Sequence, residues 1–229
     1  MRPVDKRMID ITTLSELTID GKLSLGPGAS SKDLFEFYGA ELRAWFHEQR
    51  ALHSAIMVGA GTVRSDDPEL TVRHFDGPNP LRVVPTSMGD IPLASRLLND
   101  GGATLVAVSH QASAEVVAAL AEKPNVEVLR CGATRVDLVV LMDLLRARGI
   151  RSMIAEGGSR LLHSLFEADM VSRIIIKHIP VISGALEAPT YLRPMNGTSH
   201  LALSRWRLDD MFVKSGVGVS VYSPMLTAA

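Results

Sequence analysis

The sequence predicts an α/β domain whose sheet is mixed and mostly parallel, with flanking helices and antiparallel strands at its C-terminal edge. Three observations carry this prediction. Short, almost continuously apolar runs recur along the chain, as in strands that are covered on both faces. Helical patterns alternate with these runs from about residue 55 to residue 170, which is typical of a parallel sheet. From residue 171 onward strand-like runs follow one another without a helix between them, which indicates antiparallel pairing.

Seven runs are predicted to be strands. Their bounds are Ala55–Val58, Leu81–Val84, Thr104–Val108, Val126–Leu129, Ser152–Ala155, Arg173–Ile179 and Gly218–Tyr222. One helix is predicted over residues 32 to 52, because apolar residues recur there with a period close to 3.6.

Capping residues mark two further helices. Ser113 can cap a helix that Pro124 stops. Thr134 and Asp137 resemble a capping box before a leucine-rich helix, and Gly149 stands where a C-terminal cap belongs. Near the N-terminus, Thr18–Leu23 contains Asp-Gly, the strongest local cue for a hairpin turn, although a turn alone is the favoured interpretation.

Length and composition favour one globular domain. The 229 residues fit a single domain over residues 1–229, with short flexible ends expected at 1–7 and 225–229. The formal net charge of −1 gives no global field toward nucleic acid or an anionic membrane, so we expect neither as a partner. The apolar runs are much shorter than the roughly 20 residues of a membrane helix, and no signal peptide is evident. We expect a cytoplasmic protein.

Metal chemistry is not expected. The single cysteine, Cys131, supplies neither an internal disulfide nor a Cys-rich zinc site. The seven histidines are scattered without a metal-binding motif, and His163 is more typical of a packed or surface histidine. A bound organic cofactor is then the economical source of difficult chemistry.

The first candidate site follows the run at residues 55–58. Gly59 and Gly61 begin a dinucleotide-binding pattern, but Arg64 replaces its third glycine and no acid follows the next strand. An ordinary dinucleotide site is therefore disfavoured. Two interpretations stay open: a loop that binds polar ligands through its glycines, Thr62, Asp66 and Arg73, or a glycine turn followed by a solvated charged loop.

The second candidate site is Glu156-Gly157-Gly158-Ser159, between a strand and a helix. A double glycine before a helix offers free backbone N–H groups and the positive end of the helix dipole to an anion. Glu156 lies at the carboxyl end of the strand, where α/β sheets place ligands. A plain glycine turn is the alternative, and Leu161 excludes a nucleophile elbow.

Arg50 ends the helix predicted over residues 32–52. A cation there suits the helix dipole, so a structural role is sufficient. It could instead reach a phosphate together with Arg73.

Together these segments resemble the reductase family of riboflavin biosynthesis. That family includes the reductase half of the bacterial deaminase–reductase and the stand-alone archaeal and fungal 2,5-diamino-6-ribosylamino-pyrimidinone 5′-phosphate reductases. The order of the matching stretches is kept over about residues 8 to 192. They are Thr18–Lys22, Val58–Val63, Asp66–Arg73, Pro80–Val84, Glu156–Gly158, Glu187–Tyr191, and Pro180 with Gly184.

The resemblance implies a dihydrofolate-reductase-like fold, NADPH as cofactor, a small phosphorylated substrate and a homodimer. It implies that the cofactor is bound by Thr62, Asp66, Thr86, Ser87, Gly157, Gly158 and Ser159. It places Arg50, Leu70, Arg73 and Glu156 on the substrate side. It names no proton donor and no metal.

The implied reaction reduces a ribosylamino group to a ribitylamino group by hydride transfer to C1′. Two alternatives stay open: a related reductase of a pterin or dihydrofolate, and a non-catalytic nucleotide-binding protein. The chain departs from the family pattern at Pro85-Thr86, where Asp-Ser is common, and at Ser172-Arg173, where Asp-Glu is common. Leu14 stands about where the bacterial type has a lysine.

Overall fold

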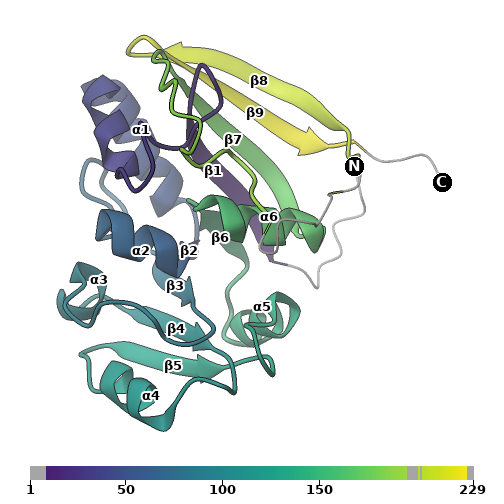
Figure 1. The fold of residues 1–229 in the computed structure, drawn as a ribbon. Coiled ribbons are helices and arrows are strands. Elements are labelled where there is room, and N and C mark those ends of the chain that lie inside the picture. The colour runs from purple at the N-terminus through teal and green to yellow at the C-terminus, as the bar shows by residue number, and fades with distance from the viewer. Residues whose placement is uncertain (1–8, 195–200, 202, 226–229) are drawn as a thin grey trace.

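A nine-stranded sheet runs through the molecule (Figure 1). The computed structural model describes residues 9–194, 201 and 203–225. The strand order across the sheet is β5-β4-β3-β2-β6-β1-β7-β9-β8. The strands are β1 (Asp10–Thr18), β2 (Ala55–Met57), β3 (Leu81–Pro85), β4 (Thr104–Val108), β5 (Val126–Arg130), β6 (Ser152–Ala155), β7 (Val171–Ile179), β8 (Trp206–Lys214) and β9 (Val217–Pro224).

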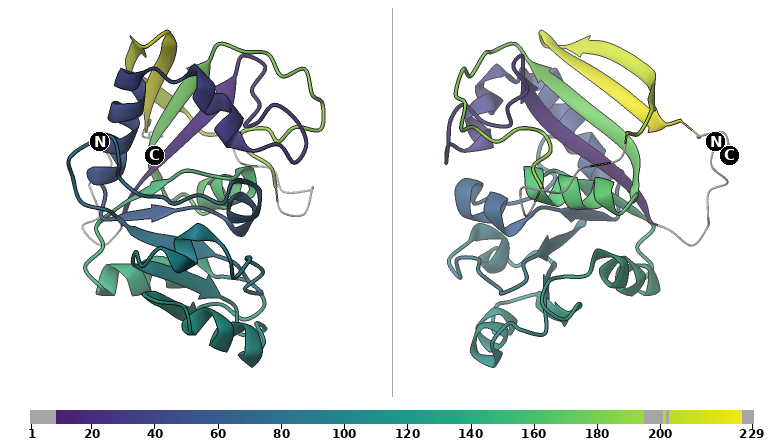
Figure 2. Two further views of the ribbon diagram at one scale, coloured as in Figure 1. Left: turned by 90° about the vertical axis from the view of Figure 1, so that its left-hand side faces the viewer. Right: turned by 45° about the vertical axis from the view of Figure 1, so that its right-hand side comes forward.

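The first seven strands pair in parallel, whereas β9 is antiparallel to both β7 and β8. The β8–β9 hairpin therefore forms one end of the sheet and β5 the other (Figure 2). The predicted fold class is confirmed. All seven predicted runs form strands, with ends that differ by a few residues.

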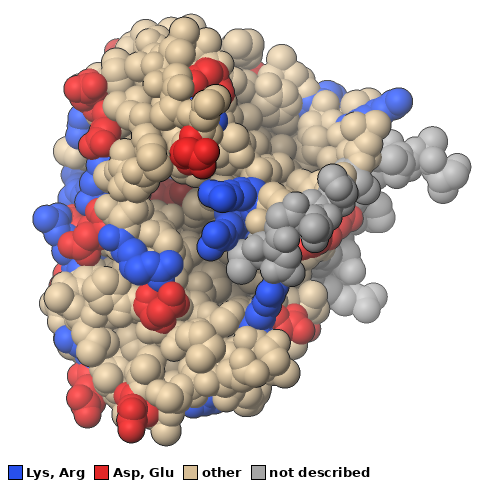
Figure 3. Space-filling model, viewed as in Figure 1, with Lys and Arg blue, Asp and Glu red and all other residues tan. Residues whose placement is uncertain are grey.

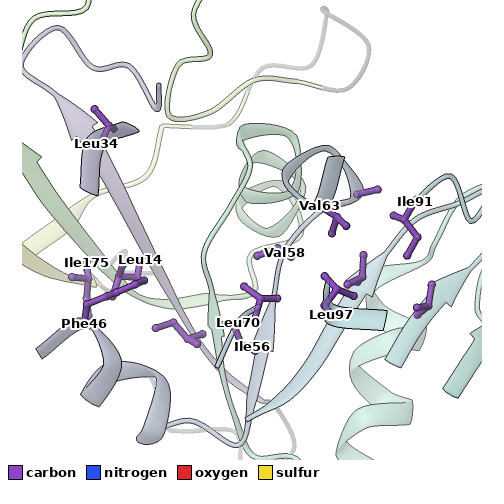
Figure 4. Packing of buried hydrophobic residues seen from close by; sticks show 14 of the residues in the cluster. Leu14, Leu34, Phe46, Ile56, Val58, Val63, Leu70, Ile91, Leu97 and Ile175 are labelled. Carbon is purple, nitrogen blue, oxygen red and sulfur yellow. The ribbon is translucent and has the colours of Figure 1, made fainter. Parts of the chain in front are cut away.

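Helices cover both faces of the sheet. They are the 3-10 helix η1 (Ser31–Phe37), α1 (Ala40–Ala51), α2 (Ala60–Asp66), α3 (Arg96–Asn99), α4 (Ala114–Ala121), α5 (Leu138–Ala147) and α6 (Ser159–Glu167). On one face Phe46, Val63 and Leu97, from α1, α2 and α3, join one buried apolar cluster (Figure 4). On the other face Leu141 of α5 and Leu162 of α6 belong to a second cluster. Among the described residues, none of these helices could span a lipid bilayer.

The continuous helix predicted over residues 32–52 is wrong. The chain forms η1 and α1, which are separated by the extended residues Tyr38 and Gly39. Gly39 packs so closely against Ser215 that a Cβ there would lie 2.5 Å from the Ser215 hydroxyl. The break therefore comes from a close approach between distant segments, which the apolar period alone does not reveal.

Two other predictions need correction. Helix α5 begins at Asp137, whose side chain accepts hydrogen bonds from the amides of Val139 and Val140, so Thr134 is not its cap. The segment after Gly59 was interpreted as a loop, but residues 60–66 form α2. The cap by Ser113 is confirmed, and Gly149 has the positive φ of a residue that ends a helix.

The Asp-Gly turn is confirmed, but it does not join a hairpin. The amide of Gly21 donates to the carbonyl of Thr18, and Gly21 has φ +75°. The residues before the turn form β1, which pairs in parallel with β6 and β7. In the described part of the chain, the segment directly after the turn forms one isolated bridge, between Lys22 and Thr190. Of the ends that were expected to be flexible, all but Met225 lie outside the described residues.

Candidate active site

A large open cleft lies at the carboxyl ends of the parallel strands. It encloses about 2610 Å³, counting the open solvent between its walls. Residues that follow β1, β2, β3 and β6 line it, as expected for a ligand site of an α/β sheet. Figure 3 shows a hollow on this face, with basic side chains near its rim. All seven residues predicted to bind the cofactor line this cleft: Thr62, Asp66, Thr86, Ser87, Gly157, Gly158 and Ser159.

Backbone forms the part of the wall where β6 gives way to α6. Gly157 has φ +108°, which only glycine adopts without strain, and a Cβ built there would meet no atom within 4 Å. A Cβ on Gly61 would likewise meet open space. Helix α6 begins at Ser159, so its first amides lack helical acceptors and face the cleft. This wall suits a ligand that needs close backbone contact and carries negative charge.

The polar side chains of the cleft are held by protein partners. Thr86 donates its hydroxyl hydrogen to Asp90 Oδ1 at 2.5 Å, and the Ser87 hydroxyl accepts from the amide of Val136 at 3.2 Å. Asp66 Oδ2 accepts from the Ser31 hydroxyl at 2.7 Å. These bonds fix the positions of the side chains before any ligand enters.

A smaller pocket opens beside the cleft, between η1, α1 and the loop after α2. The four residues predicted to bind the substrate, Arg50, Leu70, Arg73 and Glu156, all line it. Two cations that the sequence reasoning missed, Lys32 and Arg96, line it as well. Four basic side chains at one pocket suit an anionic group of a ligand.

A buried ion pair forms the floor of this pocket. Arg50 Nε and Nη2 donate to the two carboxylate oxygens of Glu156 at 2.7 Å each. Arg50 Nη1 donates to the carbonyl of Thr71 at 2.9 Å. The Arg50 guanidinium is therefore committed to protein partners, and its direct contact with a phosphate remains a prediction. Its evident role is to orient Glu156 and the loop around residue 71.

Arg73 lies at the half-exposed rim of the pocket. Its side chain contacts Glu69 and donates to the Thr71 hydroxyl at 2.7 Å. Its amide donates to Nδ1 of His47 at 3.1 Å. Burial, with the nearby cations Arg50 and Arg73, lowers the pKa of His47 to about 3, so this ring is neutral and can accept that bond.

Five residues line both the cleft and the pocket: Glu16, Ser31, Thr62, Asp66 and Glu156. The two spaces therefore meet at a shared wall. A ligand in the cleft and another in the pocket can come into contact there, which is the arrangement that a transfer reaction requires.

Glu16 was missed by the sequence reasoning. It lies on β1 directly beside Lys177 of β7, and the two side chains form a buried ion pair. The Tyr38 hydroxyl donates to the same carboxylate oxygen at 2.5 Å. Burial raises the pKa of Glu16, but Lys177 and the hydrogen bonds outweigh it and leave the pKa below its ordinary value. The available signal was Lys177 itself, a charge inside an otherwise apolar strand-like run.

The donor set does not resemble a metal centre. In the part of the chain that the structure describes, no three His, Cys, Asp or Glu side chains are grouped so that they could hold a metal ion.

Proteins of similar sequence are named as reductases, and a solved structure shares the fold. The 2,5-diamino-6-ribosylamino-4(3H)-pyrimidinone 5′-phosphate reductase of Aquifex aeolicus is 39% identical over 181 residues, which cover 79% of this chain and 80% of that protein. The reductase of the same name from Archaeoglobus fulgidus is 41% identical over 183 residues, covering 76% and 81%. A pyrimidine reductase-like protein from Corynebacterium diphtheriae has the same fold, with a TM-score of 0.79 at 18% identity over 96% of this chain and 93% of that one.

The family model described as the RibD C-terminal domain matches residues 10–213 of this chain. This range includes every residue that was predicted to bind cofactor or substrate. The resemblance drawn from the sequence is confirmed, and the chain belongs to the RibD C-terminal domain family.

Proposed function

We propose that this enzyme is an NADPH-dependent reductase of riboflavin biosynthesis that converts the ribosylamino group of a pyrimidine ribotide into a ribitylamino group. The observation that carries the proposal is the shared wall between a large backbone-lined cleft and a small cationic pocket. One space suits an elongated dinucleotide and the other a phosphorylated sugar, and their contents meet at Glu16, Thr62 and Glu156.

NADPH fits the residues of the cleft. The open backbone at Gly61 and Gly157 allows close approach, and the start of α6 favours a phosphate of the dinucleotide. Thr86 and Ser87 extend this surface along the end of β3. When bound, the reduced nicotinamide supplies the hydride, and the protein supplies orientation and electrostatics.

The substrate phosphate is assigned to the pocket, where Lys32, Arg73 and Arg96 stand. Glu69 now contacts both arginines, so a phosphate would compete with this carboxylate for them. The sugar and the base then extend toward the shared wall. This assignment gives Arg73 a role in binding the substrate and none in binding the cofactor.

The test is oxidation of NADPH by the purified protein. We expect turnover with 2,5-diamino-6-ribosylamino-4(3H)-pyrimidinone 5′-phosphate or its deaminated counterpart, and none with dihydrofolate. Tight binding of NADPH without turnover of either ribotide would contradict the proposal. The relatives favour neither a pterin reductase nor a non-catalytic protein. The homodimer and the cytoplasmic location remain predictions.

A further inference from the structure

The two side chains that donate to Glu16 reach the same carboxylate oxygen, and the residue lines the shared wall between the cleft and the pocket. The hydrogen bonds from Tyr38 and Lys177 both reach Oε1. The side chain is 11% exposed and lines both the cleft and the pocket. The carboxylate of Glu16 therefore lies where a ligand can reach it, at the point where the two spaces meet.

The surroundings keep Glu16 rigid and ionised. Lys177 is fully buried, so its ammonium needs the carboxylate as a partner. The ring of Phe46 contacts two cations, with Lys177 Nζ 3.8 Å and Arg50 Cζ 4.4 Å from its centroid. The charged and titratable groups around Glu16 are thus Lys177 on β7, Tyr38 and Arg50 from the α1 side, and Glu156 after β6.

An ionised carboxylate only accepts hydrogen bonds, so a ligand group that binds Glu16 is an N–H or O–H donor or a cation. The substrate class of the proposed function has such a group at the reacting centre, the nitrogen that joins C1′ of the sugar to the base. We propose that Glu16 is a further catalytic residue, which accepts a hydrogen bond from this nitrogen and stabilises the positive charge that it carries when the sugar ring opens. This inference rests on the proposed function.

The proposed reaction has two steps, opening of the sugar ring and transfer of hydride. The C1′–O4′ bond breaks, O4′ takes one proton from solvent, and the nitrogen keeps its hydrogen in a C1′=N–H iminium group. Hydride from the reduced nicotinamide then forms the new C1′–H bond and leaves a neutral amine and an oxidised cofactor. Glu16 remains a carboxylate throughout and acts by electrostatic stabilisation. Lys177 and Tyr38 are positioning residues, because they act only through Glu16.

The test separates a catalytic carboxylate from a structural ion pair. Glu16→Gln alone leaves the ammonium of Lys177 buried without its partner, and such a variant can fail to fold. The double variant Glu16→Gln/Lys177→Met removes both charges and keeps their approximate shapes. We expect it to keep the unfolding midpoint in urea and the Kd for NADPH, to lose on the order of 100-fold in kcat, and to bind the ribitylamino product about tenfold more weakly.

The double variant Glu127→Gln/Arg148→Met is the matched control, because it removes an exposed ion pair away from the cleft. It should keep wild-type turnover. If the Glu16/Lys177 double variant also keeps kcat and product Kd within about twofold, the pair is structural and the inference is wrong. If the wild-type protein itself shows no turnover, the proposed function fails first. The two failures are therefore distinguishable.

A pH profile tests the positioning role of Tyr38. Its hydroxyl hydrogen bond lowers the pKa of Glu16. Tyr38→Phe should therefore move the acidic limb of kcat/KM to higher pH while the Kd for NADPH stays unchanged. A purely structural loss would lower the amount of active enzyme without moving that limb, and this result would overturn the assignment.

Discussion

The cleft and the pocket are built in different ways, although they share a wall. At the turns that follow β2, β3 and β6 the cleft presents backbone, glycines and small hydroxyl side chains, and arginines stand elsewhere in its lining. The pocket is shaped by long charged side chains from elements that are far apart in sequence, as in Arg50 with Glu156 and Glu16 with Lys177. Replacing a single side chain should therefore have its larger effects in the pocket. In the cleft, ligand binding should depend more on the open backbone at the glycines.

The largest expected effect is on the pocket side. Arg50→Met leaves the Glu156 carboxylate buried without its partner, which should lower the free energy of unfolding by about 3–5 kcal/mol. The control is Arg148→Met, whose exposed pair with Glu127 should contribute less than about 1 kcal/mol. Urea unfolding measures both. Equal losses in the two variants would contradict the claim that a buried pair forms the floor of the pocket.

The next effect separates the two ligands. Arg73→Ala should raise the KM of the phosphorylated substrate roughly 10- to 100-fold, because a hydrogen bond to a charged group contributes about 1.5–3 kcal/mol. The Kd for NADPH should stay near its wild-type value, since Arg73 lines only the pocket. Steady-state kinetics and a binding titration give the two numbers. A similar rise in the KM of the substrate and in the Kd for NADPH would show that Arg73 does not bind the substrate alone.

A smaller effect tests the backbone wall of the cleft. Gly157→Ala adds a Cβ where the ligand is expected to approach, and should raise the Kd for NADPH about tenfold. Gly149→Ala is the matched control, because both glycines have positive φ and neither new Cβ would meet an atom within 4 Å. Both variants carry a similar backbone strain, so both should lose stability. Only the change at Gly157 should weaken binding of NADPH. Equal Kd values for the two variants would show that the cofactor does not approach the backbone at Gly157.

The smallest effect concerns pH and the turn that leads into the cleft. Hydrogen bonds from Thr18 and from the amide of Ser183 lower the pKa of Asp20 to about 2, from an ordinary value of 3.8. A lowered carboxyl pKa gives stability that is complete above the ordinary value and is lost as the pH falls from about 3.8 toward about 2. Asp20→Asn should flatten the pH dependence of stability in that window. An unaltered slope in Asp20→Asn would refute the assignment.

The same contrast explains how much could be predicted from the sequence. The cleft follows from local patterns, because Gly59, Gly61 and Gly157-Gly158 each stand directly after a strand-like run. The parallel sheet brings the ends of these strands to one edge without any further information. Thr62 and the turn that ends in Ser159 could therefore be named beforehand, whereas Ser87 was named only through the family resemblance, and all three line one cleft.

The two buried ion pairs at the pocket, Arg50 with Glu156 and Glu16 with Lys177, could not be predicted from local patterns. The pairing of Glu16 with Lys177 depends on the register of β1 against β7, two strands that are distant in sequence. For Arg50 the sequence left open both a structural role and a contact with a phosphate, because nothing near it in the sequence indicates that Glu156 accepts two of its hydrogen bonds. The break at Gly39 likewise reflects contact with the distant Ser215. Each of these features is set by tertiary contacts.

The most direct measurement is the structure of the enzyme with NADP⁺ and the ribitylamino 5′-phosphate product bound together. We expect the nicotinamide and C1′ to be in contact at the wall formed by Glu16, Thr62 and Glu156, with the product phosphate bound to Arg73. A product phosphate bound at the start of α6, or two ligands bound on surfaces that do not meet, would contradict it.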